Sequence, residues 1–295
     1  MRVCARPSFP PIALCRPAGF ATLTAIGVIM RSFPRARCVR AFTLIELLVV
    51  IAVVAVLIAV LLPALGAARR SAVRVRCLAS MRALGQGVHL YCDDNADALP
   101  LCDHVGGFGN PDPIGTRLAT WSVALLEYLG ADGFVRADLE QPSRLAGRMD
   151  SWRGSIESLY RCGADARSFD PPSTSAGVYD GSYGMNVYFV LTPSELDPLG
   201  GGTSRVWRRR DLIPRPGATI AFGEISEGDR ADVMVDHFMA HFWSRYGAPS
   251  DRVAKTRHGG VSDYLMLDGH AAGRVFEAVF DPDSGVDAWD PSVAR

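Results

Sequence analysis

The ionisable side chain in the most unusual setting is Glu46. It directly precedes the 22 residues from Leu47 to Ala68, none of which is charged or strongly polar. A carboxylate inside a membrane helix costs about 2.5–3.5 kcal/mol near the centre of the bilayer and less towards its edge. Glu46 therefore either marks the membrane interface or meets a cation that neutralises it.

A cut in the chain would supply that cation. If the peptide bond between Ala41 and Phe42 is cleaved, the new α-amine lies four residues before Glu46, one helical turn away on the same face. The amine and the carboxylate then neutralise each other, within one chain or between neighbouring chains. The chemistry that this spacing suggests is proteolytic processing.

Residues 41–46, Ala-Phe-Thr-Leu-Ile-Glu, resemble the prepilin peptidase site of type IV pilins and type II secretion pseudopilins. In that family a small residue, usually Gly, precedes the cut, the new N-terminal residue is often a methylated Phe, and the fifth mature residue is Glu. Ala41 stands here in the place of Gly. The resemblance implies cleavage between Ala41 and Phe42, N-methylation of Phe42, and a role for Glu46 in the axial register of an assembly. It also implies a helix kink at Pro63, where many pilin helices carry a proline.

Residues 42–68 have the length and composition of a membrane span. About 20 apolar residues cross a hydrocarbon core of about 30 Å as a helix, and this stretch lacks the polar face of a globular surface helix. It is too long for the apolar part of a secretory signal, and no small-x-small cleavage site follows it. We therefore expect a single transmembrane helix. The resemblance implies that the same helix lies in the core of a filament after assembly.

The charge distribution predicts a removable leader. Residues 1–41 contain seven arginines and no acidic residue. Residues 30–41 hold four arginines in twelve residues and fit the short basic leader of the family, so we expect translation to start at Met30. Four arginines also follow the span. The resemblance, rather than the charge count, therefore places the leader in the cytoplasm and the head in the periplasm.

An apolar stripe continues beyond the span. Within residues 69–93, apolar side chains recur at helical spacings of 3, 3, 4 and 3, at Leu78, Met81, Leu84, Val88 and Tyr91. This stripe predicts an amphipathic continuation that packs on a globular head. One helix of about 50 residues, from Phe42 to about Cys92, would be about 75 Å long.

Residues 94–295 are expected to form a head of short elements joined by long loops. We expect a short helix at 119–128, strands at 182–191 and 218–224, and a helix or irregular insertion at 232–246. We also expect a hairpin of 264–267 with 271–276, joined by a type I′ turn at Asp268-Gly269. Together with the N-terminal helix they predict an α+β, pilin-like fold in which the long helix packs on an antiparallel β-sheet.

The hairpin carries a second resemblance. His258, nine intervening residues and then Asp268-Gly269 are similar to a C-terminal signature of pilin-like proteins common in planctomycete-type bacteria. The resemblance implies that this hairpin completes the sheet, and it implies no chemical role.

Removal of the leader and its three cysteines leaves four cysteines: Cys77, Cys92, Cys102 and Cys162. Outside the cytoplasm they permit up to two disulfides in any of three pairings, with buried thiols as the alternative. Cys92 with Cys102 is the first disulfide to test, because only a short loop separates these two residues.

Two groups of side chains suggest metal sites, but neither has the full pattern. His237 and His241 would share one face of a helix, yet Phe238 occupies the place of the metalloprotease Glu. The carboxylates between Asp93 and Asp97 lack the Gly and the distal Glu of an EF-hand. A polar histidine pair and a helix-ending turn are the simpler interpretations, so we expect no metal and no cofactor.

The charge outside the leader argues against nucleic acid as a partner. After residue 41 the chain has 24 basic and 31 acidic residues, a net charge of about −7. The arginines around Trp207, at positions 205 and 208–210, suit either an acidic polymer or a solvated loop. We expect no nucleic-acid partner.

The sequence contains neither a Gly-x-Ser-x-Gly nucleophile elbow nor a phosphate-binding loop. We therefore expect a structural subunit and not an enzyme: a pilin-like protein of the inner (cytoplasmic) membrane that assembles into a type IV pilus or a type II secretion pseudopilus. The implied partners are prepilin peptidase, other pilin-like subunits in a homo- or hetero-filament, the inner-membrane assembly platform and membrane lipid. The alternative is a membrane-anchored periplasmic binding module or enzyme with a pilin-type anchor.

Overall fold

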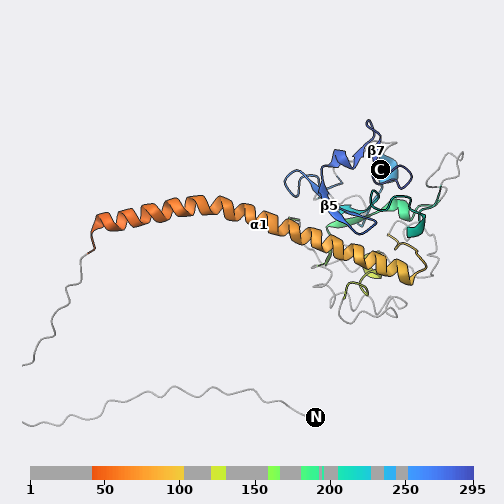
Figure 1. Cartoon of the computed structure of the whole chain (residues 1–295), viewed down its shortest axis with the longest axis horizontal. Helices are drawn as coiled ribbons and strands as arrows, with labels where there is room; N and C mark the ends of the chain where they lie inside the picture. The colour runs from red at the N-terminus through yellow and green to blue at the C-terminus, as the bar shows by residue number, and fades with distance from the viewer. Residues whose placement is uncertain are drawn as a thin grey trace, which may run out of the picture. The chain divides into compact units, whose positions relative to one another are not determined.

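A long helix opens the described part of the chain. The computed structural model describes residues 42–102, 121–130, 159–166, 181–192, 195, 205–226, 236–243 and 252–295. Helix α1 runs from Leu44 to Asp94 and continues through Pro63, where the kink stays a prediction (Figure 1). The prediction of one helix from Phe42 to about Cys92 is confirmed. The leader of residues 1–41, including the expected start at Met30, lies outside the described residues.

Hydrogen bonds and two unusual backbone conformations end α1. The Asn95 side-chain amide donates to the Tyr91 carbonyl at 2.7 Å, and the Asp97 N–H donates to the Cys92 carbonyl at 2.8 Å. Ala96 and Asp97 have φ angles of 53° and 62°, the left-handed conformation typical of helix C-termini. The helix-ending turn expected in this segment is therefore confirmed.

The first part of α1 is apolar and exposed. Its large apolar side chains, from Leu44 to Leu65, expose between 46% and 78% of their surface. In the described part of the chain, α1 is the one helix long and apolar enough to cross a membrane. Among the described residues, this apolar surface has no cover, and an exposed apolar surface of this size is typical of a site that contacts lipid or another protein.

The second part of α1 packs on the head. Leu78 of the predicted stripe is partly buried, and the other four members are buried: Met81, Leu84, Val88 and Tyr91. Two helix glycines permit close contact. A Cβ at Gly85 would lie 2.9 Å from Leu265, and a Cβ at Gly87 would lie 3.0 Å from Leu129. The predicted stripe is confirmed, and the two glycines let the sheet and the 121–130 segment approach the helix backbone.

The head contains a five-stranded sheet with the order β3-β1-β2-β4-β5. Its strands are β1 (Tyr183–Asn186), β2 (Ile220–Glu224), β3 (His237–Phe238), β4 (Ser262–Met266) and β5 (Ala271–Arg274). Strand β3 pairs with β1 in parallel, whereas the other neighbours are antiparallel. A separate pair joins β6 (Phe280–Asp281) to β7 (Val286–Asp287). The predicted α+β, pilin-like arrangement is confirmed, with a mixed sheet instead of an antiparallel one.

The segment 232–246 is expected to be a helix or an irregular insertion, and the structure describes its residues 236–243. These residues form the short strand β3 and the 3-10 helix η4 (Ala240–Phe242), so no α-helix runs through His237 and His241. The reason is a tertiary contact, because the Met185 N–H of β1 donates to the Asp236 carbonyl at 2.8 Å and draws this segment to the sheet edge.

Two further elements are shorter than predicted. The strand predicted at 182–191 ends at Asn186, whose side-chain oxygen accepts from the Tyr188 N–H at 3.1 Å and starts the 3-10 helix η2 (Val187–Phe189). The helix predicted at 119–128 is α3 (Trp121–Ala124), followed by turn residues. At Asn186, local hydrogen bonding therefore stops the strand earlier than its composition suggested.

The predicted C-terminal hairpin is present, but its turn is of another type. The Met266 N–H donates to the His270 carbonyl at 2.8 Å, which leaves residues 267–269 as the loop. Within this loop Gly269 alone has a positive φ, 92°. A type I′ turn needs positive φ at both central residues, so that prediction is wrong. The three-residue loop with Gly in the left-handed conformation is the next most common hairpin connection.

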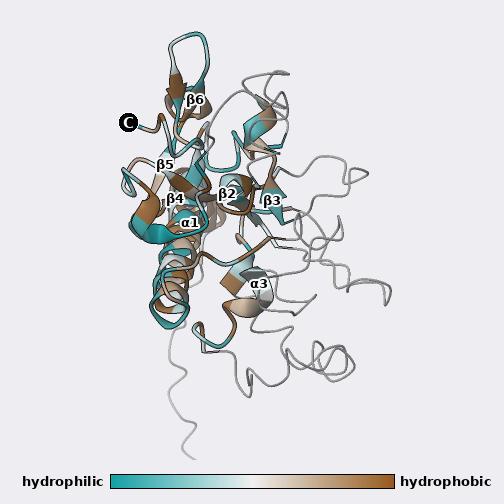
Figure 2. Ribbon diagram, turned by 90° about the vertical axis from the view of Figure 1, so that its right-hand side faces the viewer, coloured by the Kyte–Doolittle hydropathy of each residue, from teal (hydrophilic) through white to brown (hydrophobic). Residues whose placement is uncertain are grey.

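Side chains of the sheet alternate between two faces. Asp263 of β4 faces α1, where Arg74 bonds to it, while the next residue, Tyr264, contacts Trp289 on the opposite face. Glu224 of β2 accepts a hydrogen bond from the Asp263 N–H at 3.0 Å. Figure 2 looks nearly along α1 and shows β2 and β4 next to it. The alternation therefore holds two carboxylates in the buried layer between sheet and helix.

Candidate functional site

The N-terminal end of α1 contains a reciprocal set of hydrogen bonds between Thr43 and Glu46. Oε2 of Glu46 accepts from the Thr43 N–H at 2.9 Å and from the Thr43 hydroxyl at 2.8 Å. In return the Thr43 hydroxyl oxygen accepts from the Glu46 N–H at 3.2 Å. This capping box satisfies backbone donors that have no acceptor within the helix. Its sequence signature is Thr-x-x-Glu, residues 43–46.

One oxygen of the Glu46 carboxylate remains available. Both bonds from Thr43 reach Oε2, and the described residues supply no hydrogen bond to Oε1. Phe42 is 69% exposed, and Ala41, on the other side of the expected cut, lies outside the described residues. Glu46 can therefore cap its own helix and at the same time accept a cation through Oε1.

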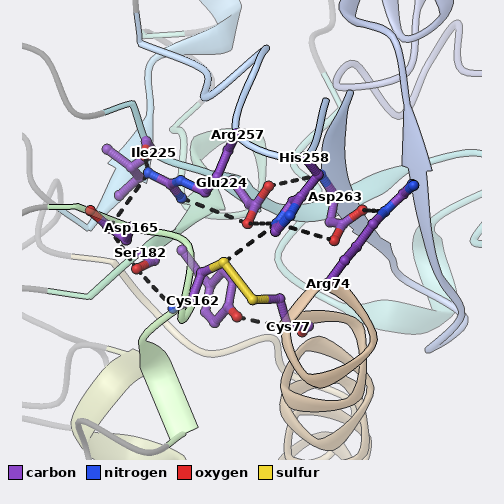
Figure 3. Close-up of polar contacts among 11 residues, drawn as sticks. Arg74, Cys77, Cys162, Asp165, Ser182, Glu224, Ile225, Arg257, His258 and Asp263 are labelled. Atoms are coloured by element: carbon purple, nitrogen blue, oxygen red, sulfur yellow. Dashed lines mark hydrogen bonds and ion pairs between the residues drawn. A yellow bond between two sulfur atoms is a disulfide. The ribbon is translucent and has the colours of Figure 1, made fainter. Parts of the chain in front are cut away.

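A buried polar site lies between α1 and the sheet (Figure 3). We call it the His258 cluster; its members are Arg74, Cys77, Cys162, Asp165, Glu224, Arg257, His258 and Asp263. Nε2 of His258 lies 3.1 Å from Glu224 Oε1 and 3.5 Å from Asp263 Oδ2. Burial raises the pKa of the Asp263 carboxyl, and the neighbouring Glu224 carboxylate raises it further. Arg74 of α1 opposes this effect from 3.4 Å away.

Arg257 connects the two sides of the cluster. Its Nη2 donates to the Ile225 carbonyl at 2.6 Å and lies 3.5 Å from Asp165 Oδ2, while its Nη1 lies 3.6 Å from Glu224 Oε1. The Ser182 hydroxyl donates to Asp165 at 2.6 Å. Buried charges are tolerated when they are paired and hydrogen-bonded. The cluster therefore pairs three carboxylates with two guanidinium groups and one imidazole.

The disulfide of the described residues joins Cys77 to Cys162, so the predicted Cys92–Cys102 disulfide is wrong. Cys77 lies on the buried face of α1, and its Cα is 5.1 Å from that of Cys162, within the usual range for a disulfide. Closeness in sequence favours Cys92 with Cys102, whereas folding brings together cysteines that are 85 residues apart. Cys92 and Cys102 are buried thiols.

The two histidines singled out as a metal pair do not share a helix face. His237 lies in β3, and its Nδ1 is 2.6 Å from Asp236 Oδ1. His241 lies in η4, where its ring contacts those of Tyr188 and Phe242. Because the helix that would have aligned them is absent from these described residues, the geometry proposed for zinc there does not form.

The C-terminal signature does not form one site. His258 belongs to the buried cluster, whereas Asp268 lies in the hairpin loop, where it accepts from the His270 N–H at 3.0 Å. Gly269 lies beside His89, since a Cβ on this glycine would be 3.4 Å from His89 Nε2. The signature therefore marks two different places in the head, and its resemblance stays a prediction.

The arginines near Trp207 tie the head to the end of α1. Nη2 of Arg210 lies 2.7 Å from Asp93 Oδ1 and 2.6 Å from Asp97 Oδ1. Arg209 pairs with Asp211 at 2.8 Å. Two of the carboxylates considered for Ca²⁺, Asp93 and Asp97, are thus paired with a guanidinium group, and the third, Asp94, accepts from the Tyr128 hydroxyl at 3.1 Å.

The His258 cluster was not predicted from the sequence. Its members come from separate segments, and no spacing pattern joins them. The available signals were weak: Glu224 and Asp263 are acidic residues within strands that are otherwise apolar, and His258 was selected for its resemblance alone.

Comparison with known proteins identifies one segment. The model of the prokaryotic N-terminal methylation motif matches residues 36–62. No curated protein and no solved structure matches the chain. Over the matched residues, the finding supports a type IV pilin-like N-terminus of the kind that prepilin peptidase processes.

Proposed function

We propose that the chain is a pilin-like structural subunit that prepilin peptidase cuts between Ala41 and Phe42. Phe42 is then N-methylated, and the subunit assembles into a type IV pilus or a type II secretion pseudopilus. The motif match supports this proposal, because residues 36–62 include the expected cut, Glu46 and the start of the apolar helix. Before assembly the head lies in the periplasm and the leader in the cytoplasm.

The observation that carries the proposal is the exposed apolar surface of α1, most of which lies within the matched motif. Its side chains from Leu44 to Leu65 are uncovered within the described chain. A bilayer covers such a surface before assembly, and the equivalent helices of neighbouring subunits cover it in a filament core. This partition gives the chain a span of residues 42–68, an amphipathic segment of residues 69–93 and a head of residues 94–295.

Glu46 is proposed to set the axial register through its free oxygen. The capping box occupies Oε2, which leaves Oε1 for the α-amine at Phe42 of an adjacent subunit. In the dry core of a filament an ion pair of this kind is favoured because each charge is costly alone. The register is then fixed where the two charges meet.

Two matched substitutions separate capping from register. Glu46→Gln keeps a side chain that can complete the capping box but removes the charge, whereas Thr43→Ala removes the hydroxyl of the box and keeps the charge. We expect both variants to enter the membrane and to be cut, and only Glu46→Gln to be lost from the filament fraction. Processing is measured by the mass of the product, and assembly by recovery of sheared or cross-linked filaments.

Two outcomes would count against the proposal. If Glu46→Gln assembles normally and Thr43→Ala does not, the carboxylate acts only as a cap. If the cut-blocking variant Ala41→Leu yields a product of the same mass as the wild type, processing does not occur at this bond.

A further inference from the structure

Four potential metal ligands of the His258 cluster lie together. The sulfurs of Cys77 and Cys162, a ring nitrogen of His258 and a carboxylate oxygen of Glu224 all lie within 4.8 Å of one another. The Cys162 sulfur is 3.4 Å from His258 Nε2, which is 3.1 Å from Glu224 Oε1. Figure 3 shows these side chains converging from four parts of the chain: α1, the segment before β1, strand β2 and the loop before β4.

The distances between these ligand atoms are close to the ligand-to-ligand distances of a tetrahedral zinc site. With Zn–S of about 2.3 Å and Zn–N and Zn–O of about 2.0–2.1 Å, tetrahedral angles place S and N about 3.5 Å apart, and N and O about 3.4 Å apart. The corresponding separations in this chain are 3.4 and 3.1 Å. Two thiolate ligands would lie about 3.8 Å apart, so the sulfurs can take these positions once the bond between them is broken.

The charge of the cluster suits a dication in the reduced state. Among the described residues, the carboxylates of Asp165, Glu224 and Asp263 lie beside the guanidinium groups of Arg74 and Arg257 and the imidazole of His258. Two thiolates would add two negative charges, and one Zn²⁺ ion would cancel them. The ion and the two thiolates together add no net charge to the cluster, which avoids the cost of uncompensated burial.

We propose that reduction of the Cys77–Cys162 disulfide creates a Zn²⁺ site in the His258 cluster. The two cysteine sulfurs are two of its ligands, and His258 Nε2 and a carboxylate oxygen of Glu224 are the other two. An external dithiol supplies two electrons and two protons, becomes a disulfide itself and leaves two protein thiols. Binding of Zn²⁺ then releases both thiol protons to solvent. Each state links α1 to the head, by a covalent bond or through the metal, so the helix stays attached in oxidising and in reducing surroundings.

A cavity lies beside the cluster, at His258 and at Gly163, the residue after Cys162. It has a volume of about 480 Å³, and its lining includes Arg69, Arg70, Arg74, Gly163, His258 and Gly259. Arginines concentrate anions by long-range attraction, and thiolate or carboxylate-bearing reductants are anions. The arginines thus attract an anionic reductant to the side of the cluster that carries Cys162 and His258.

The first experiment uses the full chain purified in detergent. One sample stays oxidised, the other is reduced with a water-soluble phosphine, and both are freed of metal, mixed with ZnCl₂ and desalted. We expect about one zinc ion per chain in the reduced sample and less than about a tenth of that in the oxidised one. Zinc should also slow alkylation of Cys77 and Cys162 in the reduced wild type at least about tenfold, as mass spectrometry of the cysteine peptides would show.

Variants then test the ligand set. His258→Asn and Cys162→Ser remove ligands, and His241→Asn changes a histidine outside the cluster as the matched control. Retained zinc should fall at least about tenfold in the first two and stay unchanged in the control. The proposal is overturned if reduced wild-type chain retains no zinc, if zinc leaves alkylation of Cys77 and Cys162 unchanged, or if His258→Asn binds as the wild type does. The alkylation test needs no substitution, so misfolding of a variant does not affect it.

Discussion

Removal of the Cys77–Cys162 disulfide should destabilise the head by several kcal/mol. The two cysteines are 85 residues apart. A cross-link that closes a loop of this length lowers the entropy of the unfolded chain by about 15 cal/mol/K, equivalent to about 4.5 kcal/mol at 25 °C. In a head of this size, 1 kcal/mol corresponds to about 2–4 °C, so the melting temperature should fall by about 9–18 °C.

The assay compares oxidised wild type with the Cys77→Ala/Cys162→Ala double variant. Both are unfolded thermally and with guanidinium as full chains in detergent, with EDTA present so that no metal replaces the covalent link. The buried side chains Trp121, Trp243 and Trp289 report unfolding through their fluorescence.

The matched control is Cys92→Ala, which removes a buried thiol outside the disulfide and should cost only about 1 kcal/mol. If the double variant unfolds within about 1 kcal/mol of the wild type, the disulfide does not constrain the chain as the structure indicates.

Three further predictions concern the second part of α1. Leu84→Ala opens a cavity beneath the helix at a side chain that is 1% exposed. It should lower the free energy of unfolding, measured with denaturant, by about 2–5 kcal/mol. A loss below about 1 kcal/mol would mean that the helix is not packed there. Arg210→Ala removes partly exposed ion pairs to Asp93 and Asp97, so it should cost about 1 kcal/mol or less while amide hydrogen exchange at the helix end becomes faster. Burial raises the pKa of the Cys92 thiol to about 12, so its alkylation at pH 8 should be at least about a hundredfold slower in the folded chain than in the unfolded chain. Equal rates would place this thiol at the surface.

The elements predicted correctly are those marked by a pattern of neighbouring residues along one continuous stretch of sequence. An uninterrupted apolar run followed by a stripe at helical spacing needs no tertiary information, and α1 follows it from Leu44 to Asp94. The hairpin was also detectable, because Asp268-Gly269 separates two short strand-forming segments. The turn type was missed because both candidate loops use a glycine, and the hydrogen bond between Met266 and His270 decides between them.

The candidate site depended on contacts between distant parts of the chain. The strand at His237 exists only because β1 lies beside it, and the disulfide forms between cysteines 85 residues apart. Alternation along β2 and β4 places Glu224 and Asp263 on one face, but their meeting with His258 depends on the paths of loops. The capping box at Thr43 is the exception, since its four-residue signature was present in the sequence.

The most direct test of processing at this site is mass spectrometry of the N-terminal peptide of the protein isolated from cells. We expect a peptide that begins at Phe42, with a methyl group on its α-amine and no trace of residues 1–41. A protein in the membrane that still carries Arg40 and Ala41 joined to Phe42 would contradict cleavage between Ala41 and Phe42.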